Sequence, residues 1–245
     1  MGTRLMGEAA GRTGPRTRPR ITAGPLGARL AWVILFAVAF GFVEASVVAY
    51  LRELFHPQDT GLPLALPPKR VLLIEGSREI ATLIVLVALA AAAGRRFQER
   101  AGLWLVAFGI WDISYYVWLR VMLGWPAGLL DWDILFFVPR PWLAPVVAPV
   151  ALSLLMIAFG WFLIRREVHR RPFRLPFIGW MLVALATALV LRSFLHRPGS
   201  SPDGPAPGSY SYGLLIAGIL LYALALLAGR RTSRGARRSP DRGFQ

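Results

Sequence analysis

The sequence predicts an all-α, polytopic integral membrane protein with six transmembrane helices and both termini in the cytoplasm. Of its 245 residues, 56% are hydrophobic and 17% are charged, and the apolar residues gather in long runs. A soluble fold of this length cannot bury so much apolar surface, whereas a lipid bilayer requires it. The runs do not alternate in polarity as barrel strands do, and backbone groups in lipid must be satisfied internally. We therefore expect helices.

Six apolar stretches are long enough to cross about 30 Å of hydrocarbon, which takes roughly 20 helical residues. The predicted spans cover about 30–51, 71–94, 101–124, 142–164, 176–195 and 213–229. The first span follows a 29-residue tail and is too long for the core of a signal peptide, so we interpret it as an uncleaved helix. The basic tails at 1–29 and 230–245 and the loop at 196–211 have the composition of disordered segments.

The distribution of arginine predicts the orientation of the spans. Twenty arginines lie in the two tails and in the 2–3 and 4–5 loops, whereas the other three loops hold six basic residues. Because cytoplasmic loops carry the excess of basic residues, both termini should be cytoplasmic. This topology accounts for the net charge of +15, so we expect the lipid bilayer as a partner and no nucleic acid. Twenty-seven arginines against one lysine indicate a GC-rich genome, and we expect the bacterial inner membrane.

Several kinds of chemistry are excluded by residues that the chain lacks. It has no cysteine, which removes disulfides, iron–sulfur clusters and cysteine nucleophiles. Its three histidines fall in predicted loops or at helix ends, so no facing pair is available for haem. No HExxH, GxSxG or Walker A motif is present. We predict no haem, no iron–sulfur cluster and no other cofactor, and we allow for a bound cation.

Ionisable residues within the predicted membrane are concentrated in the first three spans. Each costs about 2.5–3.5 kcal/mol at a helix centre, which makes it a candidate for a functional site. The candidates for proton or cation binding are Glu44, Glu75, Glu79 and Asp112. The supporting polar residues are Arg78, Thr82, Tyr115, Tyr116 and Arg120. Helical periodicity places the polar residues of each span on one stripe toward the outer side, and we expect the stripes to converge in a buried pocket.

The charges in this predicted pocket do not balance, because four acids face two arginines. Either some acids are protonated or a cation binds among them. Glu44 and Asp112 have no oppositely charged neighbour one turn away, so we expect these two to hold the proton or cation. The alternative is a purely structural network of ion pairs, which includes an i,i+3 pair between Glu75 and Arg78.

The segment between the third and fourth spans combines aromatic and acidic residues. Indole rings anchor at the membrane interface, so we expect a short interfacial helix that dips into the membrane over the acidic stripes. The lid candidates are Trp125, Asp131, Trp132, Asp133, Arg140 and Trp142. Because Asp131 and Asp133 lie two residues apart, they would point to different faces of a helix and make a poor dedicated metal pair. The alternative is an ordinary aromatic belt with aspartate caps.

Three classes of function remain open, and the sequence does not decide whether the protein is an enzyme. The first is a small proton- or cation-coupled transporter, which the excess of acids favours slightly. The second is a membrane-embedded enzyme that acts on a lipid-linked substrate at the outer face. The third is a non-catalytic subunit or scaffold that contacts a membrane-protein partner through the fifth and sixth helices.

Overall fold

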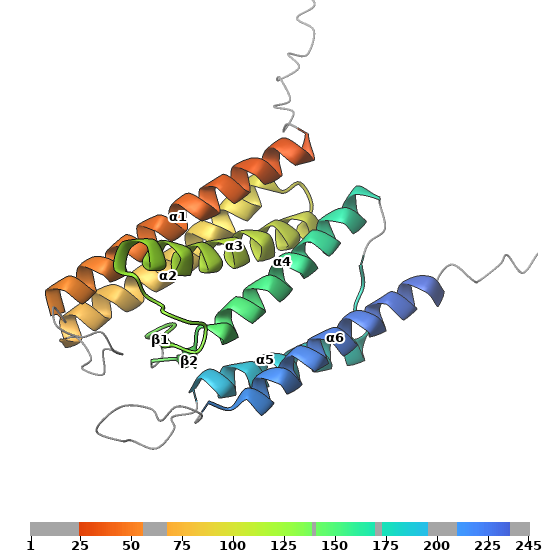
Figure 1. Cartoon of the computed structure of the whole chain (residues 1–245). Coiled ribbons are helices and arrows are strands. Elements are labelled where there is room, and N and C mark those ends of the chain that lie inside the picture. The colour runs from red at the N-terminus through yellow and green to blue at the C-terminus, as the bar shows by residue number, and fades with distance from the viewer. Residues whose placement is uncertain (1–24, 56–67, 139–140, 170–172, 196–209, 236–245) are drawn as a thin grey trace, which may run out of the picture.

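The computed structural model describes residues 25–55, 68–138, 141–169, 173–195 and 210–235. These residues form six helices and two short strands (Figure 1). In chain order the elements are α1 (Leu26–Phe55), α2 (Lys69–Ala93), α3 (Phe97–Leu123), β1 (Trp132–Ile134), β2 (Leu143–Pro145), α4 (Val147–Val168), α5 (Phe177–Leu195) and α6 (Tyr212–Gly235).

Five of the described helices are long and apolar enough to cross a membrane, namely α1, α3, α4, α5 and α6. The prediction of a helical membrane protein is confirmed at this level. The remaining helix, α2, is apolar only in its second half. Its first half carries the charged residues Lys69, Arg70, Glu75, Arg78 and Glu79.

The helix boundaries differ from the predicted spans mainly because helices continue past the apolar run. The first helix begins at Leu26 and ends at Phe55, and α6 extends to Gly235 into the predicted tail. Hydropathy marks the part of a helix that suits lipid, whereas a helix can continue into the headgroup region. Residues 1–24, 236–245 and most of the predicted 196–211 loop lie outside the described residues.

The first four helices form an up-and-down bundle in which α3 packs against α1, α2 and α4 (Figure 1). We name the two ends of this bundle by what they carry. The arginine end, where α1 and α3 begin and α2 and α4 end, carries Arg29, Arg95 and Arg96. The opposite end, where β1 and β2 lie, is the ribbon end.

Two glycines allow α3 and α4 to cross closely. A Cβ atom on Gly102 would lie 2.8 Å from the carbonyl oxygen of Gly160, and one on Gly160 would lie 2.5 Å from that of Gly102. Both distances are shorter than real Cβ contacts. Small residues at such a crossing let helix backbones approach, which is the usual basis of helix packing in membranes.

The arginine half of the bundle is filled by an apolar core. Its buried members come from the first halves of α1 and α3 and the second halves of α2 and α4. They are Val33, Ala37, Leu86, Ala90, Leu103, Val106, Ala107, Trp111 and Ile164.

Helices α5 and α6 form a hairpin beside the bundle (Figure 1). Aromatic contacts join this hairpin to the bundle at both ends. At the ribbon end, Phe194 of α5 stacks on Trp142 with ring centroids 6.1 Å apart. At the arginine end, Phe173 lies edge-on to Phe159 and Phe162 of α4. The hairpin is therefore held at its two ends.

The predicted interfacial helix between the third and fourth spans is wrong. Strand β1 pairs antiparallel with β2 instead, with Asp133 opposite Ala144. Prolines at 141 and 145 cannot donate a helical hydrogen bond, and each disfavours helical backbone at the preceding residue. Side-chain burial along β1 alternates, which turns Asp133 inward between two half-buried neighbours.

Candidate functional site

A cavity of about 120 Å³ opens at the ribbon end between α1, α2, α3 and the segment that follows β1. The structure brings to its wall most of the polar residues singled out in the first three helices. They are Glu44, Glu75, Arg78, Glu79, Thr82, Asp112, Tyr115 and Tyr116. The apolar core of the arginine half lies beneath it, with Trp111 in common to both.

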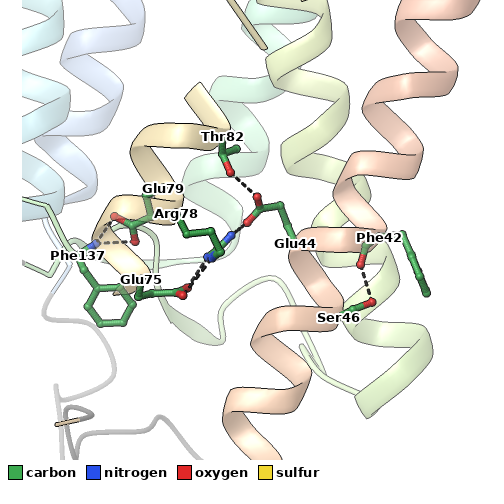
Figure 2. Close-up of polar contacts among 8 residues, drawn as sticks. All are labelled: Phe42, Glu44, Ser46, Glu75, Arg78, Glu79, Thr82 and Phe137. Atoms are coloured by element: carbon green, nitrogen blue, oxygen red, sulfur yellow. Dashed lines mark hydrogen bonds and ion pairs between the residues drawn. The ribbon is translucent and has the colours of Figure 1, made fainter. Parts of the chain in front are cut away.

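Arg78 is the centre of the charge network on one side of this pocket (Figure 2). Its Nε donates to Glu75 Oε2 at 3.0 Å, the i,i+3 pair that the spacing predicts. Its guanidinium also pairs with Glu44 of α1, which accepts a further hydrogen bond from Thr82. Glu44 therefore has a cationic partner on α2, although no oppositely charged residue lies one turn away from it on α1. Spacing along one helix reveals only partners on that helix, whereas Arg78 reaches Glu44 from α2.

A close approach between α1 and α3 positions Glu44. One turn before it, a Cβ atom on Gly41 would lie 2.9 Å from the carbonyl oxygen of Trp111. The absence of a side chain at Gly41 lets α1 contact the α3 backbone there, which places Glu44 beside the pocket residues of α3.

Glu79 points the other way from Arg78, toward the segment after β1 (Figure 2). Its two carboxylate oxygens accept the backbone N–H of Phe137 at 2.9 and 3.0 Å. This hydrogen bond joins the segment after β1 to α2. The Glu79 side chain therefore holds part of the cavity wall in place.

Asp112 is hydrogen-bonded to the fourth helix. Ser153 of α4 donates its hydroxyl to Asp112 Oδ2 at 2.8 Å, and Ser153 is fully buried. Among the described residues Asp112 has no ion-pair partner. It is therefore a carboxyl that faces the cavity with only a neutral hydrogen bond.

Asp133 enters the pocket from the ribbon and is 5% exposed. The hydroxyl of Tyr116 donates to its Oδ2 at 3.1 Å, and Arg52 Nη2 lies 3.7 Å from its Oδ1. The guanidinium of Arg52 also lies over the Trp125 ring, 3.7 Å from the centroid. Burial raises the pKa of Asp133 to about 6, because removal from water disfavours the charged form more than Arg52 and Tyr116 favour it.

Two residues that the sequence reasoning missed complete the site. The predicted first span ends at residue 51, which leaves Arg52 in a loop. Because α1 continues to residue 55, Glu44, Val48 and Arg52 follow one another at intervals of four residues and share a helix face. This spacing is the signal in the sequence that points to Arg52 as a pocket residue. Ser153 gave no signal, since a lone serine in an apolar helix has many uses.

Arg120, predicted to support the site, lies outside the pocket. It is exposed in the last turn of α3 and donates to the backbone carbonyls of Gly124 and Pro126. A guanidinium at a helix C-terminus often binds the free carbonyls there, so its position in the last turn outweighed its place on the polar stripe.

The lid candidates divide between the pocket and its surroundings. Of the five candidates that the structure describes, Asp133 alone is part of the cavity wall. Asp131 accepts the backbone N–H groups of Ala127 and Gly128, and so stabilises a turn. The indole rings pack against neighbouring aromatic rings, Trp132 against Tyr210 and Trp142 against Phe136 and Phe194. Arg140 lies outside the described residues.

The cavity wall carries a formal excess of negative charge. Five carboxyls line it, from Glu44, Glu75, Glu79, Asp112 and Asp133, against the two guanidiniums of Arg52 and Arg78. Within the described part of the chain, no three histidine, aspartate or glutamate side chains are grouped so that they would hold a metal ion. The carboxyls therefore surround the cavity without converging on one point.

Comparisons with known proteins do not assign a family or a function to the chain. No protein-family model, no curated protein and no solved structure matches the chain. The pocket itself is therefore the basis for any functional conclusion.

Proposed function

We propose that the protein is a multi-pass protein of the bacterial inner membrane that binds a proton or a small cation in its ribbon-end pocket, as one step of cation-coupled transport. The observation that carries this proposal is the charge on the cavity wall, where five carboxyls face two guanidiniums. Unpaired charges are costly in a poorly hydrated site, so protons or a bound cation would stabilise the pocket.

The division of partners among the carboxyls supports Asp112 and Asp133 as the binding groups. Glu44 and Glu75 share Arg78, and Glu79 accepts a backbone N–H. Within the described segments Asp112 is bonded only to a serine hydroxyl, and Asp133 lies at the long distance of 3.7 Å from Arg52. Since the acids do not converge as a metal centre, a proton or a monovalent cation fits better than a tightly held divalent ion.

In this proposal the chain crosses the membrane six times, with both termini in the cytoplasm and the ribbon end outside. The excess of arginine in the tails and in the 2–3 and 4–5 loops supports this orientation. Reporter fusions at residues 98, 168 and 200 should read cytoplasmic, cytoplasmic and external. Any other pattern would contradict the six-span arrangement.

The proposed binding is tested by thermal unfolding of the purified full-length protein. The measurement covers pH 4 to 9 with sodium, potassium, magnesium or tetramethylammonium chloride at constant ionic strength. We expect the unfolding temperature to depend on pH or on one of these cations. Asp112→Asn keeps the hydrogen bond to Ser153 and removes the ionisable group, so this variant should fold and lose much of that response.

Asp131→Asn is the matched control, because it removes a carboxylate at the same end that does not line the cavity. It should leave the response to pH and cations unchanged. A wild-type protein that responds to neither, together with an Asp112→Asn variant that behaves like wild type, would reduce the pocket to a structural ion-pair network.

A second candidate function is a membrane-embedded enzyme that acts on a lipid-linked substrate from the ribbon end. The apolar core beneath the pocket favours it, because that core separates the pocket from the arginine end. Vesicles that hold the protein and a pH-sensitive dye distinguish the two candidates. Proton movement driven by a cation gradient supports transport, whereas cation binding without any flux would favour the enzyme.

A further inference from the structure

A second cavity lies at the arginine end, about as far from the first as the bundle allows. Its volume is about 280 Å³, and it is formed where α1 begins, α2 meets α3, and α4 ends. Three arginines and two glutamates line it, together with apolar side chains of the same helices. The lining residues are Pro25, Leu26, Arg29, Arg95, Arg96, Glu99, Ile164, Glu167 and Val168.

Two ion pairs hold two of the three arginines around this cavity. Arg29 Nη2 pairs with Glu99 Oε1 at 2.7 Å, and Glu99 Oε2 also accepts the backbone N–H of Arg95 at 2.8 Å. Arg96 Nη1 pairs with Glu167 Oε1 at 3.1 Å, while 69% of the Arg96 side chain remains exposed. A guanidinium has five N–H donors, and this pair uses one of those on Arg96. The exposed guanidinium of Arg96 thus presents further cationic donors at the cavity.

The cavity lies just beyond a belt of exposed tryptophans. Exposed tryptophans lie within roughly two helical turns of this end, namely Trp32 of α1, Trp161 of α4 and Trp180 of α5. Indole rings gather at the boundary between acyl chains and headgroups. The arginines lie beyond this belt, and Leu26 and Ile164 form an apolar wall beside them. An amphipathic ligand with a phosphate group suits such a lining.

We propose that the cavity at the arginine end binds the phosphate group of an anionic phospholipid. Basic pockets between membrane helices on the cytoplasmic side hold acidic headgroups by charge and by N–H donation to phosphate oxygens. The bound lipid would bridge α1, the α2–α3 turn and the end of α4. This site is independent of the proposed cation binding at the ribbon end.

The test titrates dioleoylphosphatidylglycerol, dioleoylphosphatidylcholine or soluble glycerol 3-phosphate into the purified full-length protein in neutral detergent. Binding is read by native mass spectrometry and by the shift in unfolding temperature. We expect phosphatidylglycerol to bind and stabilise, and the other two to have little effect. The double variant Arg95→Gln/Arg96→Gln should weaken phosphatidylglycerol binding about tenfold or more, since each arginine contributes roughly 1 kcal/mol.

Arg165→Gln is the matched control, because this arginine lies at the same end over the Trp161 ring and does not line the cavity. It should leave the affinity within about twofold of wild type. Glu167→Gln removes a carboxylate from the wall and releases Arg96, so it should tighten binding about threefold to fivefold. This gain keeps the proposal testable even where the double variant fails to fold.

Three outcomes would overturn the proposal. Equal binding of phosphatidylcholine, which has the same phosphate next to a quaternary ammonium, would show that the net negative charge of the headgroup is not recognised. Tight binding of glycerol 3-phosphate alone would assign the cavity to a soluble phosphate compound. Unchanged affinity in both Arg95→Gln/Arg96→Gln and Glu167→Gln would place lipid binding elsewhere on the protein.

Discussion

The two halves of the helix bundle are built from the same four helices but are stabilised by different interactions. The apolar core of the arginine half packs alanine, aliphatic and tryptophan side chains, and none of its buried members is charged. The ribbon half encloses a cavity whose wall has five carboxyls and two guanidiniums. Dispersion and close backbone approach stabilise the first half, whereas charge pairing and hydrogen bonds stabilise the second.

The difference shows where each half tolerates change. In the apolar core of the arginine half the distance between helices decides stability, so added volume should matter there and pH should not. In the ribbon half each charged group depends on a partner from another element. Loss of one partner, or a change in its protonation, should therefore matter more than a change in volume.

The largest effect should follow removal of Arg78, the cation shared by Glu44 and Glu75. Arg78→Ala leaves buried carboxylates without a partner, which costs about 3–5 kcal/mol of unfolding free energy. Chemical unfolding of the purified wild type and variant in detergent at neutral pH measures this loss of unfolding free energy. Arg120→Ala removes an exposed arginine from the same end and should cost about 1 kcal/mol or less. Equal losses in the two variants would contradict the central role of Arg78.

A pH-dependent effect should arise at Asp133, in the ribbon. Burial raises its pKa from 3.8 to about 6, so the folded protein keeps a proton that the unfolded chain has lost at the same pH. Its contribution to stability is therefore complete below pH 3.8 and is lost as the pH rises through 6. Between pH 4 and 7 this loss amounts to about 2 kcal/mol.

Asp133→Asn should remove that part of the pH dependence, as measured by unfolding of wild type and variant at both pH values. Asp131→Asn, whose carboxylate caps a neighbouring turn, should keep the wild-type profile. A stability difference between wild type and Asp133→Asn that stays constant from pH 4 to 7 would be inconsistent with a buried, protonated Asp133.

The smallest of these effects should come from Gly160→Ala at the crossing of α3 and α4. The added Cβ meets the Gly102 carbonyl oxygen at 2.5 Å, so the helices must separate, at about 1–2 kcal/mol. The loss should be the same at pH 4 and 7, which sharpens the contrast with the ribbon half. Gly213→Ala in α6, where a Cβ meets nothing within 4 Å, should be neutral. Equal effects at the two glycines would argue against the close crossing.

Composition and periodicity were enough to predict the helices and the polar stripes. Long apolar runs leave few alternatives in a bilayer, and a period of 3.6 residues fixes which side chains share a face. For this reason Glu75, Arg78, Glu79 and Thr82 were expected together on one side of α2, and the structure places all four on the cavity wall.

Contacts between elements were decided only by the tertiary structure. Arg78 pairs with Glu44 on another helix, Arg52 meets Asp133 across the cavity, and Ser153 of α4 bonds to Asp112. The ribbon likewise replaced an expected helix, because prolines and pairing between residues about ten positions apart outweighed local amphipathicity. Local spacing determines which groups share a face, whereas the rotation and crossing of the helices determine which groups meet.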